Sequence, residues 1–244
     1  MKDIIKAEFM KIKRKKLFLL ILLGELASFF ITYIIQGRNT GKQTWVDILY
    51  NFSGFNFMIM IIIFTIVISK LVDVEYKADM WKLMFTAVSD KNKLFAGKFI
   101  CVMVLIAFSA VVEFFGIIVL GTHVGAEGVD YPLIFKQCAL PLIGYLPVIV
   151  LQFGLSSMIK NQSISIAGGV VGCFLGVFGM VMPFHKVLIW TYPFLTAPMT
   201  IFQEGSKAIT IMNQDSMLFS FVSIAVAAVM FFISLHLYNN KENF

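Results

Sequence analysis

The chain has 244 residues, of which 59% are hydrophobic, and a formal net charge of +6. Its mean hydropathy is +0.87, whereas soluble proteins contain only about 45–50% apolar residues, so the composition excludes an ordinary soluble protein. Basic residues beside membrane spans set topology and contact anionic lipid headgroups. We therefore predict an integral membrane protein that contacts membrane lipids and has no nucleic-acid partner.

The first 16 residues combine a basic cluster with an apolar stripe. Ile5, Phe9 and Ile12 recur at helical spacing, while most of the lysines lie elsewhere around the same helix. This pattern predicts an amphipathic helix that rests in the headgroup plane. The alternative is a basic, loosely ordered tail.

The apolar run at about 17–35 is long enough to cross the bilayer, and no small-x-small cleavage pattern follows it. We therefore expect a retained first span instead of a cleaved signal peptide. In total we predict an all-α integral membrane protein whose residues 1–244 form a single transmembrane domain. Its six spans are expected at about 17–35, 52–71, 94–120, 133–159, 163–184 and 217–238.

The basic residues are distributed unevenly between the two sides of this arrangement. Fifteen lysines and arginines fall on the side that receives both termini and the segment 70–98, against five on the other side. The positive-inside rule then places both termini in the cytoplasm.

The segment 70–98 contains a second amphipathic pattern. Acidic residues at its start lead into apolar residues at helical spacing, and the turn-forming "SDKNK" ends the pattern. With no soluble domain to cover it, such a helix lies in the headgroups or docks into a groove of another protein.

At these residues the chain resembles the ABC-2 type transporter permeases. Members of that family begin with an amphipathic helix, here "KAEFMKIKRKK", have six spans, and carry a short helix in the first cytoplasmic loop, here "DMWKLMFTAVS". A basic end follows that helix, here Lys91 or Lys93, and the next span carries a lysine, here Lys98. The resemblance implies that the loop is a coupling helix seated in a cleft of a nucleotide-binding ATPase subunit. Its contact residues would be Glu75, Asp79, Trp81, Met84, Phe85 and Val88.

The modest size of the chain resembles the permeases of lantibiotic immunity and bacitracin-type efflux. That resemblance implies export of an amphipathic antimicrobial peptide across a bacterial cell membrane for self-protection. A dimer of ATPase subunits would bind ATP and Mg²⁺, and a second permease chain, identical or paralogous, would pair with this one. The resemblance assigns no cofactor to this chain.

Motifs that would give the chain its own chemistry are missing from the sequence. It has no GxxxxGK[ST] phosphate loop, no HExxH and no GxSxG. The histidines (His123, His185, His236) and the cysteines (Cys101, Cys138, Cys173) lack metal-ligand spacing. We predict no catalytic residues and no metal site, so the chain is expected to be a non-enzymatic transmembrane subunit.

Two carboxylates lie within predicted spans, Glu25 and Glu113. A charge exposed to lipid there costs about 2.5–3.5 kcal/mol or more, so each side chain should face protein or water. They line a substrate path or bind a cationic part of the substrate; alternatively, each is protonated or hydrogen-bonded to a neighbouring helix and only fixes packing.

Two further features concern packing. Gly168, Gly172 and Gly176 repeat at four-residue spacing, which predicts close approach of a partner on one helix face. Between the fifth and sixth spans, a proline-broken apolar segment is expected to form short outer helices that are interfacial or re-entrant, with Trp190 and Tyr192 at headgroup depth. An aromatic contact with an amphipathic substrate is the alternative for this segment.

Other functions remain open at this point. The chain is also compatible with a non-ATP membrane channel or structural subunit, or with export of another amphipathic substrate such as a lipid or drug. A membrane-embedded enzyme would need a convergent polar set within the spans, and only Glu25, Glu113 and scattered serines and threonines are available.

Overall fold

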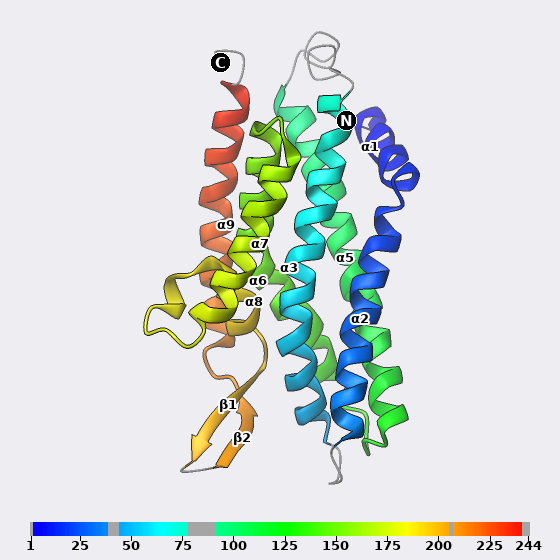
Figure 1. Cartoon of the computed structure of the whole chain (residues 1–244), viewed down its shortest axis with the longest axis vertical. Coiled ribbons are helices and arrows are strands. Elements are labelled where there is room, and N and C mark those ends of the chain that lie inside the picture. The colour runs from blue at the N-terminus through cyan, green and yellow to red at the C-terminus, as the bar shows by residue number, and fades with distance from the viewer. Residues whose placement is uncertain (1, 39–43, 78–90, 205–206, 241–244) are drawn as a thin grey trace.

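A computed structural model of the chain shows long helices packed side by side (Figure 1). It describes residues 2–38, 44–77, 91–204 and 207–240, without the side chains of residues 2, 3, 75, 77 and 201–209. Within these ranges six helices are long and apolar enough to cross a bilayer, which confirms the predicted mainly helical, six-span class. They are α2 (Leu17–Gly37), α3 (Trp45–Lys77), α5 (Lys91–Val124), α6 (Tyr131–Met158), α7 (Gln162–Gly179) and α9 (Ser216–Asn239). Both ends of the chain lie at the same end of the bundle (Figure 1).

The helices differ in length from the apolar runs that predicted them. α3 begins at Trp45 instead of near residue 52, because Thr44 caps it: its Oγ1 accepts a hydrogen bond from the Asp47 amide at 3.2 Å. α7 ends at Gly179 instead of near residue 184, since the chain turns over residues 180–184. Hydropathy marks the lipid-facing part of a helix and misses such capped or turned ends.

A short helix, α1 (Lys2–Arg14), precedes the first span and packs against α5. Lys16 adopts a left-handed conformation, with φ of 53°, between α1 and α2, so the chain changes direction there. Ile12 is fully buried and Ile5 packs against the core, whereas Phe9 is 38% exposed. The predicted apolar stripe therefore does not lie on one surface. Ile5 and Ile12 face the protein core, whereas Phe9 faces outward.

The third helix lies at the centre of the bundle. α3 packs against α2, α5, α6 and α7, while α9 packs mainly against α6. The main core gathers apolar side chains of these helices, including Met60, Ile61 and Phe64 of α3 and Phe153 of α6. The helices around α3 therefore pack against it through one shared apolar core.

Between α7 and α9 the chain folds back into the bundle. The short elements η1 (His185–Val187), η2 (Ile189–Thr191) and α8 (Tyr192–Leu195) follow one another, and α8 packs against α6. A side chain placed on Gly144, midway along α6, would collide with Thr196 and with the backbone of Tyr192 and Pro193. The segment is therefore re-entrant.

The aromatic residues of this segment face the protein. Tyr192 is only 4% exposed, and its ring lies 6.1 Å from that of Phe219 in α9. The indole of Trp190 covers Gly172 on α7. The prediction that Trp190 and Tyr192 anchor the surface at headgroup depth is wrong, because both rings fill gaps between helices.

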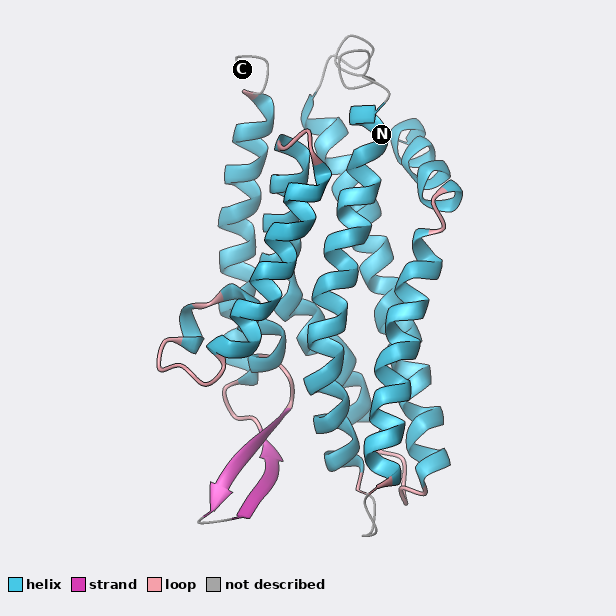
Figure 2. Cartoon of the chain, in the orientation of Figure 1, coloured by secondary structure: helices cyan, strands magenta, loops and turns pink. Residues whose placement is uncertain are grey.

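An antiparallel hairpin follows, formed by β1 (Met199–Glu204) and β2 (Lys207–Met212), with Met199 opposite Met212. Figure 2 shows these strands at the end of the bundle opposite the two termini, which we call the hairpin end. Met199 is fully buried against Trp45, Leu49 and Phe52 of α3. This hairpin was not predicted from the sequence.

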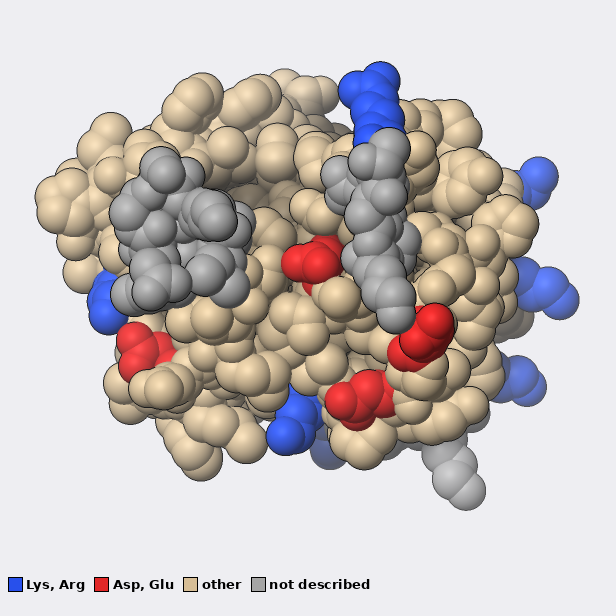
Figure 3. Space-filling model, turned by 90° about the horizontal axis from the view of Figure 1, so that it is seen from below, with Lys and Arg blue, Asp and Glu red and all other residues tan. Residues whose placement is uncertain are grey.

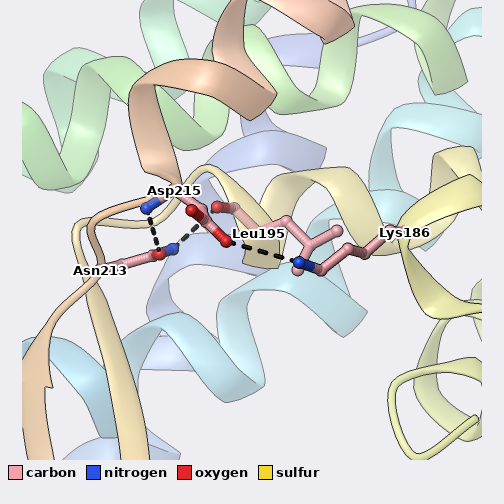
Figure 4. Close-up of polar contacts among 4 residues, drawn as sticks. All are labelled: Lys186, Leu195, Asn213 and Asp215. Atoms are coloured by element: carbon pink, nitrogen blue, oxygen red, sulfur yellow. Dashed lines mark hydrogen bonds and ion pairs between the residues drawn. The ribbon is translucent and has the colours of Figure 1, made fainter. Parts of the chain in front are cut away.

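Asn213 fastens the hairpin to the start of α9 (Figure 4). Its Nδ2 donates to the carbonyls of Leu195 at 2.8 Å and Ala197 at 3.0 Å, and its Oδ1 accepts from the Asp215 amide at 3.1 Å. Lys186 forms a 3.5 Å ion pair with Asp215. One asparagine therefore connects α8, the hairpin and the last span.

The predicted glycine row on α7 is only partly used within the chain. A side chain at Gly172 would collide with the indole of Trp190, and one at Gly176 would lie 2.9 Å from the Trp190 carbonyl oxygen. Gly168, in contrast, has no described atom within 4 Å of the position that a Cβ would take. The row faces Trp190 at two positions and open space at the third.

We expect Gly172→Ala to destabilise the protein by about 1–3 kcal/mol, because the new methyl group overpacks the Trp190 contact. Gly168→Ala is the matched control: it makes the same chemical change on the same helix and should be neutral or stabilising by up to about 1 kcal/mol. Unfolding of both purified variants in detergent measures the difference. Equal stability of the two variants would contradict the packing described for Gly172.

Candidate functional site

The first span turns its polar residues inward. Glu25, Ser28, Thr32 and Gln36 are buried, whereas Leu23, Leu26 and Phe30 of the same helix are exposed. These polar positions follow helical spacing, so they form one stripe along α2. Lipid cannot solvate polar groups, and the stripe must therefore face the other helices.

The two predicted carboxylates meet in this region. Glu25 is fully buried, and Ser109 of α5 donates a 2.7 Å hydrogen bond to its Oε1. Its other oxygen, Oε2, has no hydrogen-bond partner in the described part of the chain. Glu113 lies one turn beyond Ser109, is buried, and is close enough to Glu25 for their charges to interact.

The second and fourth spans, α3 and α6, complete the group. Ser28 donates to Asn56 Oδ1 of α3 at 3.0 Å, and Gln137 of α6 donates to Ser53 of α3 at 2.6 Å. We call this set the polar seam. Its members are Glu25, Ser28, Ser53, Asn56, Ser109, Glu113 and Gln137.

The chemistry of the polar seam follows from its composition. Carboxyl, amide and hydroxyl groups can hold protons, water or a cationic group, but buried carboxylates in apolar surroundings need a neutralising partner. Besides Glu25 Oε2, Gln137 Oε1 is buried with no partner among the described residues. The polar seam therefore has spare acceptor capacity in the membrane interior.

A second polar cluster lies nearer the two termini. Gln152 of α6 donates to Ser165 Oγ of α7 at 2.8 Å and to Ser69 Oγ of α3 at 3.3 Å. Ser156 lies within hydrogen-bond distance of both serine hydroxyls, 3.1 Å from that of Ser69 and 2.7 Å from that of Ser165. This cluster joins α3, α6 and α7 through side chains that satisfy one another.

The predicted coupling residues are the least described part of the chain. Asp79, Trp81, Met84, Phe85 and Val88 lie outside the described residues, and Glu75 lies near the end of α3 without a described side chain. The connection in which they fall leaves α3 at Lys77 and enters α5 at Lys91, at the end of the bundle that holds both termini.

Comparison with known families agrees with this architecture. The model of the "ABC-2 family transporter protein" family matches residues 4–179, from α1 to the last residue of α7. This chain belongs to the ABC-2 transporter family. Neither a curated protein nor a solved structure matches it.

Membership of the ABC-2 transporter family indicates the function of the six helices. An ABC-2 permease is a transmembrane transport subunit, and this multi-pass bundle has the helices that such a subunit requires. The match ends where α7 ends, so the re-entrant segment, the hairpin and α9 of this ABC-2 permease lie beyond it.

The carboxylates of the polar seam were predicted from the sequence, whereas their amide and hydroxyl partners were not. Asn56 and Gln137 were available as isolated polar residues within apolar runs. The stripe of α2 was also visible, since positions 25, 28, 32 and 36 recur every three or four residues. The pairing between helices has no such signal in one sequence.

We expect Ser109→Ala to destabilise the ABC-2 permease by about 0.5–2 kcal/mol, because a buried carboxyl loses its donor. In a Glu25→Leu background the same change should cost little, since the acceptor is gone. Reversible unfolding in detergent of the four proteins of this double-mutant cycle gives the coupling free energy.

Ser223→Ala is the control for that cycle. Ser223 is fully buried in α9 and donates to the Phe219 carbonyl of its own helix at 2.7 Å. Its removal therefore leaves no side chain of another helix without a hydrogen-bond partner. It should cost the same with and without Glu25. If Ser109→Ala cost the same in both backgrounds, the hydrogen bond between Ser109 and Glu25 would not contribute to stability.

Proposed function

We propose that the chain is the permease subunit of an ATP-driven exporter that removes a cationic amphipathic peptide, such as a lantibiotic, from the membrane for self-protection. The observation that carries the proposal is the family match across α1 to α7, in a bundle with six candidate spans. The substrate is inferred from the buried carboxylates Glu25 and Glu113, whose charge suits a cationic ligand.

The distribution of charge supports an orientation in a bacterial cell membrane. The end with both termini carries a basic group that includes Lys13, Arg14, Lys15, Lys16, Lys70, Lys91 and Lys160. The hairpin end, which Figure 3 shows face-on, has scattered charges of both signs. The charged residues there with described side chains are Arg38, Lys136 and Lys186 with Asp47, Glu127, Asp130 and Asp215. By the positive-inside rule the termini are cytoplasmic.

Coupling to ATP hydrolysis is assigned to the connection between α3 and α5. In this proposal a dimer of cytoplasmic ATPase subunits binds ATP and Mg²⁺, and the residues from Glu75 to Val88 carry its closure into α3 and α5. The central position of α3, in contact with four other spans, supports this assignment. Motion at its cytoplasmic end would reach the polar seam through Asn56 and Ser53.

A second permease chain, identical or paralogous, pairs with this one in the proposed exporter. The polar seam is closed within one chain, because Glu25 is fully buried between α2 and α5. Transport along it therefore requires α2 to separate from α5, and a partner chain supplies the surface that keeps the separated helices out of lipid. The open face at Gly168 suits close approach of such a partner.

The coupling assignment predicts a specific loss of binding. Coexpressed ATPase subunit should copurify with the chain, and the double variant Trp81→Asp, Phe85→Asp should reduce the recovered ATPase at least tenfold, because a charge replaces each apolar anchor. Tyr131→Asp, at a residue 57% exposed at the start of α6 and at the opposite end of the bundle, is the control and should retain the ATPase. Undiminished binding by the double variant would reject the coupling helix, and no copurification with the wild type would favour a channel.

The substrate assignment predicts that Glu25→Gln leaves expression and thermal stability intact and lowers resistance to cationic lantibiotics several-fold. The amide is similar in shape to the carboxyl group but cannot carry the negative charge that a cation needs. Minimal inhibitory concentrations of cells that coexpress the ATPase measure the effect. Full resistance with both Glu25→Gln and Glu25→Leu would show that Glu25 only packs.

A further inference from the structure

A polar cleft opens between α3 and the turn that joins α6 to α7, at the end of the bundle with both termini. Its volume is about 610 Å³, and its lining includes Lys70, Asp73 and Tyr76 of α3 with Lys160, Gln162 and Ser163 of the turn and α7. Figure 1 shows α3 and α7 side by side along this part of the bundle. The cleft lies near the C-terminal end of α3, one of the candidate spans.

The charges of the cleft favour an anion. Lys70 and Lys160 are exposed, and neither forms an ion pair with a residue in the described part of the chain. Asp73 is the acidic residue of the lining and already has an interaction of its own. α7 also begins at this point, and its first amide groups add positive potential. Two ammonium groups and a helix start together suit a phosphate group.

Gln162 adds a requirement for a hydrogen-bond donor. It is buried, and its Nε2 donates to the carbonyls of Ser156 at 2.9 Å and Ile159 at 2.7 Å. Its Oε1 has no partner among the described residues. Since both amide hydrogens are already used, a hydroxyl or ammonium group that enters the cleft would supply the donor that this oxygen lacks among the described residues.

An apolar track continues from the cleft toward the membrane centre. Below Lys70, the half-buried Ile66, Ile62 and Ile59 follow at helical spacing on one side of α3. On α7 the half-buried Ile166, which lines the cleft, is followed one turn later by Val170. A ligand whose phosphate sits between the lysines would extend its apolar part along this track.

We propose that the cleft binds an anionic phospholipid with a hydroxylated headgroup, of the phosphatidylglycerol type. The phosphate lies between Lys70 and Lys160, a headgroup hydroxyl donates to Gln162 Oε1, and an acyl chain follows the isoleucines of α3. Basic pockets between spans bind anionic headgroups in this way. The site goes beyond the transport role and does not depend on it.

Native mass spectrometry of the full-length, delipidated chain tests the proposal. The probes are dioleoyl phosphatidylglycerol, phosphatidylmethanol, phosphatidylethanolamine and phosphatidylcholine, titrated separately. We expect phosphatidylglycerol to bind at least tenfold more tightly than phosphatidylcholine. It should also exceed phosphatidylmethanol, which has the same charge and no headgroup hydroxyl, by several-fold. Equal affinity for all four lipids, or tightest binding of phosphatidylethanolamine, overturns the proposal.

A double variant, Lys70→Gln with Lys160→Gln, should lower phosphatidylglycerol affinity at least tenfold and leave phosphatidylcholine unchanged. The matched control, Lys13→Gln with Lys15→Gln, removes the same charge from the same end of the bundle, at exposed positions in and just after α1, and should bind like the wild type. Equal losses in both variants would reduce the effect to general electrostatics and reject the site.

Two other occupants have distinct signatures. Competition by millimolar glycerol 3-phosphate or inorganic phosphate would identify a soluble anion site in place of a lipid site. Loss of ATPase copurification in the Lys70, Lys160 variant, with lipid binding intact, would assign the cleft to the partner subunit. Either result overturns the lipid proposal without bearing on whether the chain transports a peptide.

Discussion

The hydrogen bond from Ser109 to Glu25 is the constraint on which the arrangement of the spans depends. A rotation of α2 by one residue, about 100°, would carry the carboxyl group toward lipid, where exposure costs about 2.5–3.5 kcal/mol or more. The bond therefore fixes which face of α2 meets α5. In that rotation Glu25 takes the direction of Leu26, whose side chain is 51% exposed in the structure.

The polar groups that follow from this constraint form two clusters separated by an apolar layer. On α3 the polar seam ends at Asn56 and the second cluster begins near Ser69, and Met60, Ile61 and Phe64 between them belong to the main core. Within the described part of one chain the two clusters are thus not continuous. A permease of this shape needs a change in helix packing, or the surface of a second chain, before a polar substrate can pass.

The sequence allowed the spans to be predicted because the length of an apolar run is itself a physical requirement of the bilayer. It also indicated that Glu25 and Glu113 face inward, since the cost of exposing either to lipid decides the matter. The partners of Glu25 and the hairpin at Met199 could not be predicted in the same way. Both depend on contacts between residues far apart in the chain, such as Ser109 with Glu25 and Met199 with Trp45.

The rings of Trp190 and Tyr192 were misplaced for a related reason. Hydropathy gives Trp190 and Tyr192 the same preference for a membrane interface or a protein interior, and only the room left by Gly172 and Gly144 decides between them. The glycine spacing was visible in the sequence, but it identified a close contact and not its occupant. At Gly172 and Gly176 that occupant is Trp190 of the short helix η2 instead of another span.

The early end of α7 has a consequence for the bilayer around the protein. With 18 residues, α7 rises only about 27 Å, slightly less than a hydrocarbon core of about 30 Å. Val181, Phe184 and Val187 follow its end with their side chains exposed. If this end of α7 lies in the hydrocarbon core, these side chains give lipid an apolar contact where the helix has already ended, which would lessen the hydrophobic mismatch of so short a span.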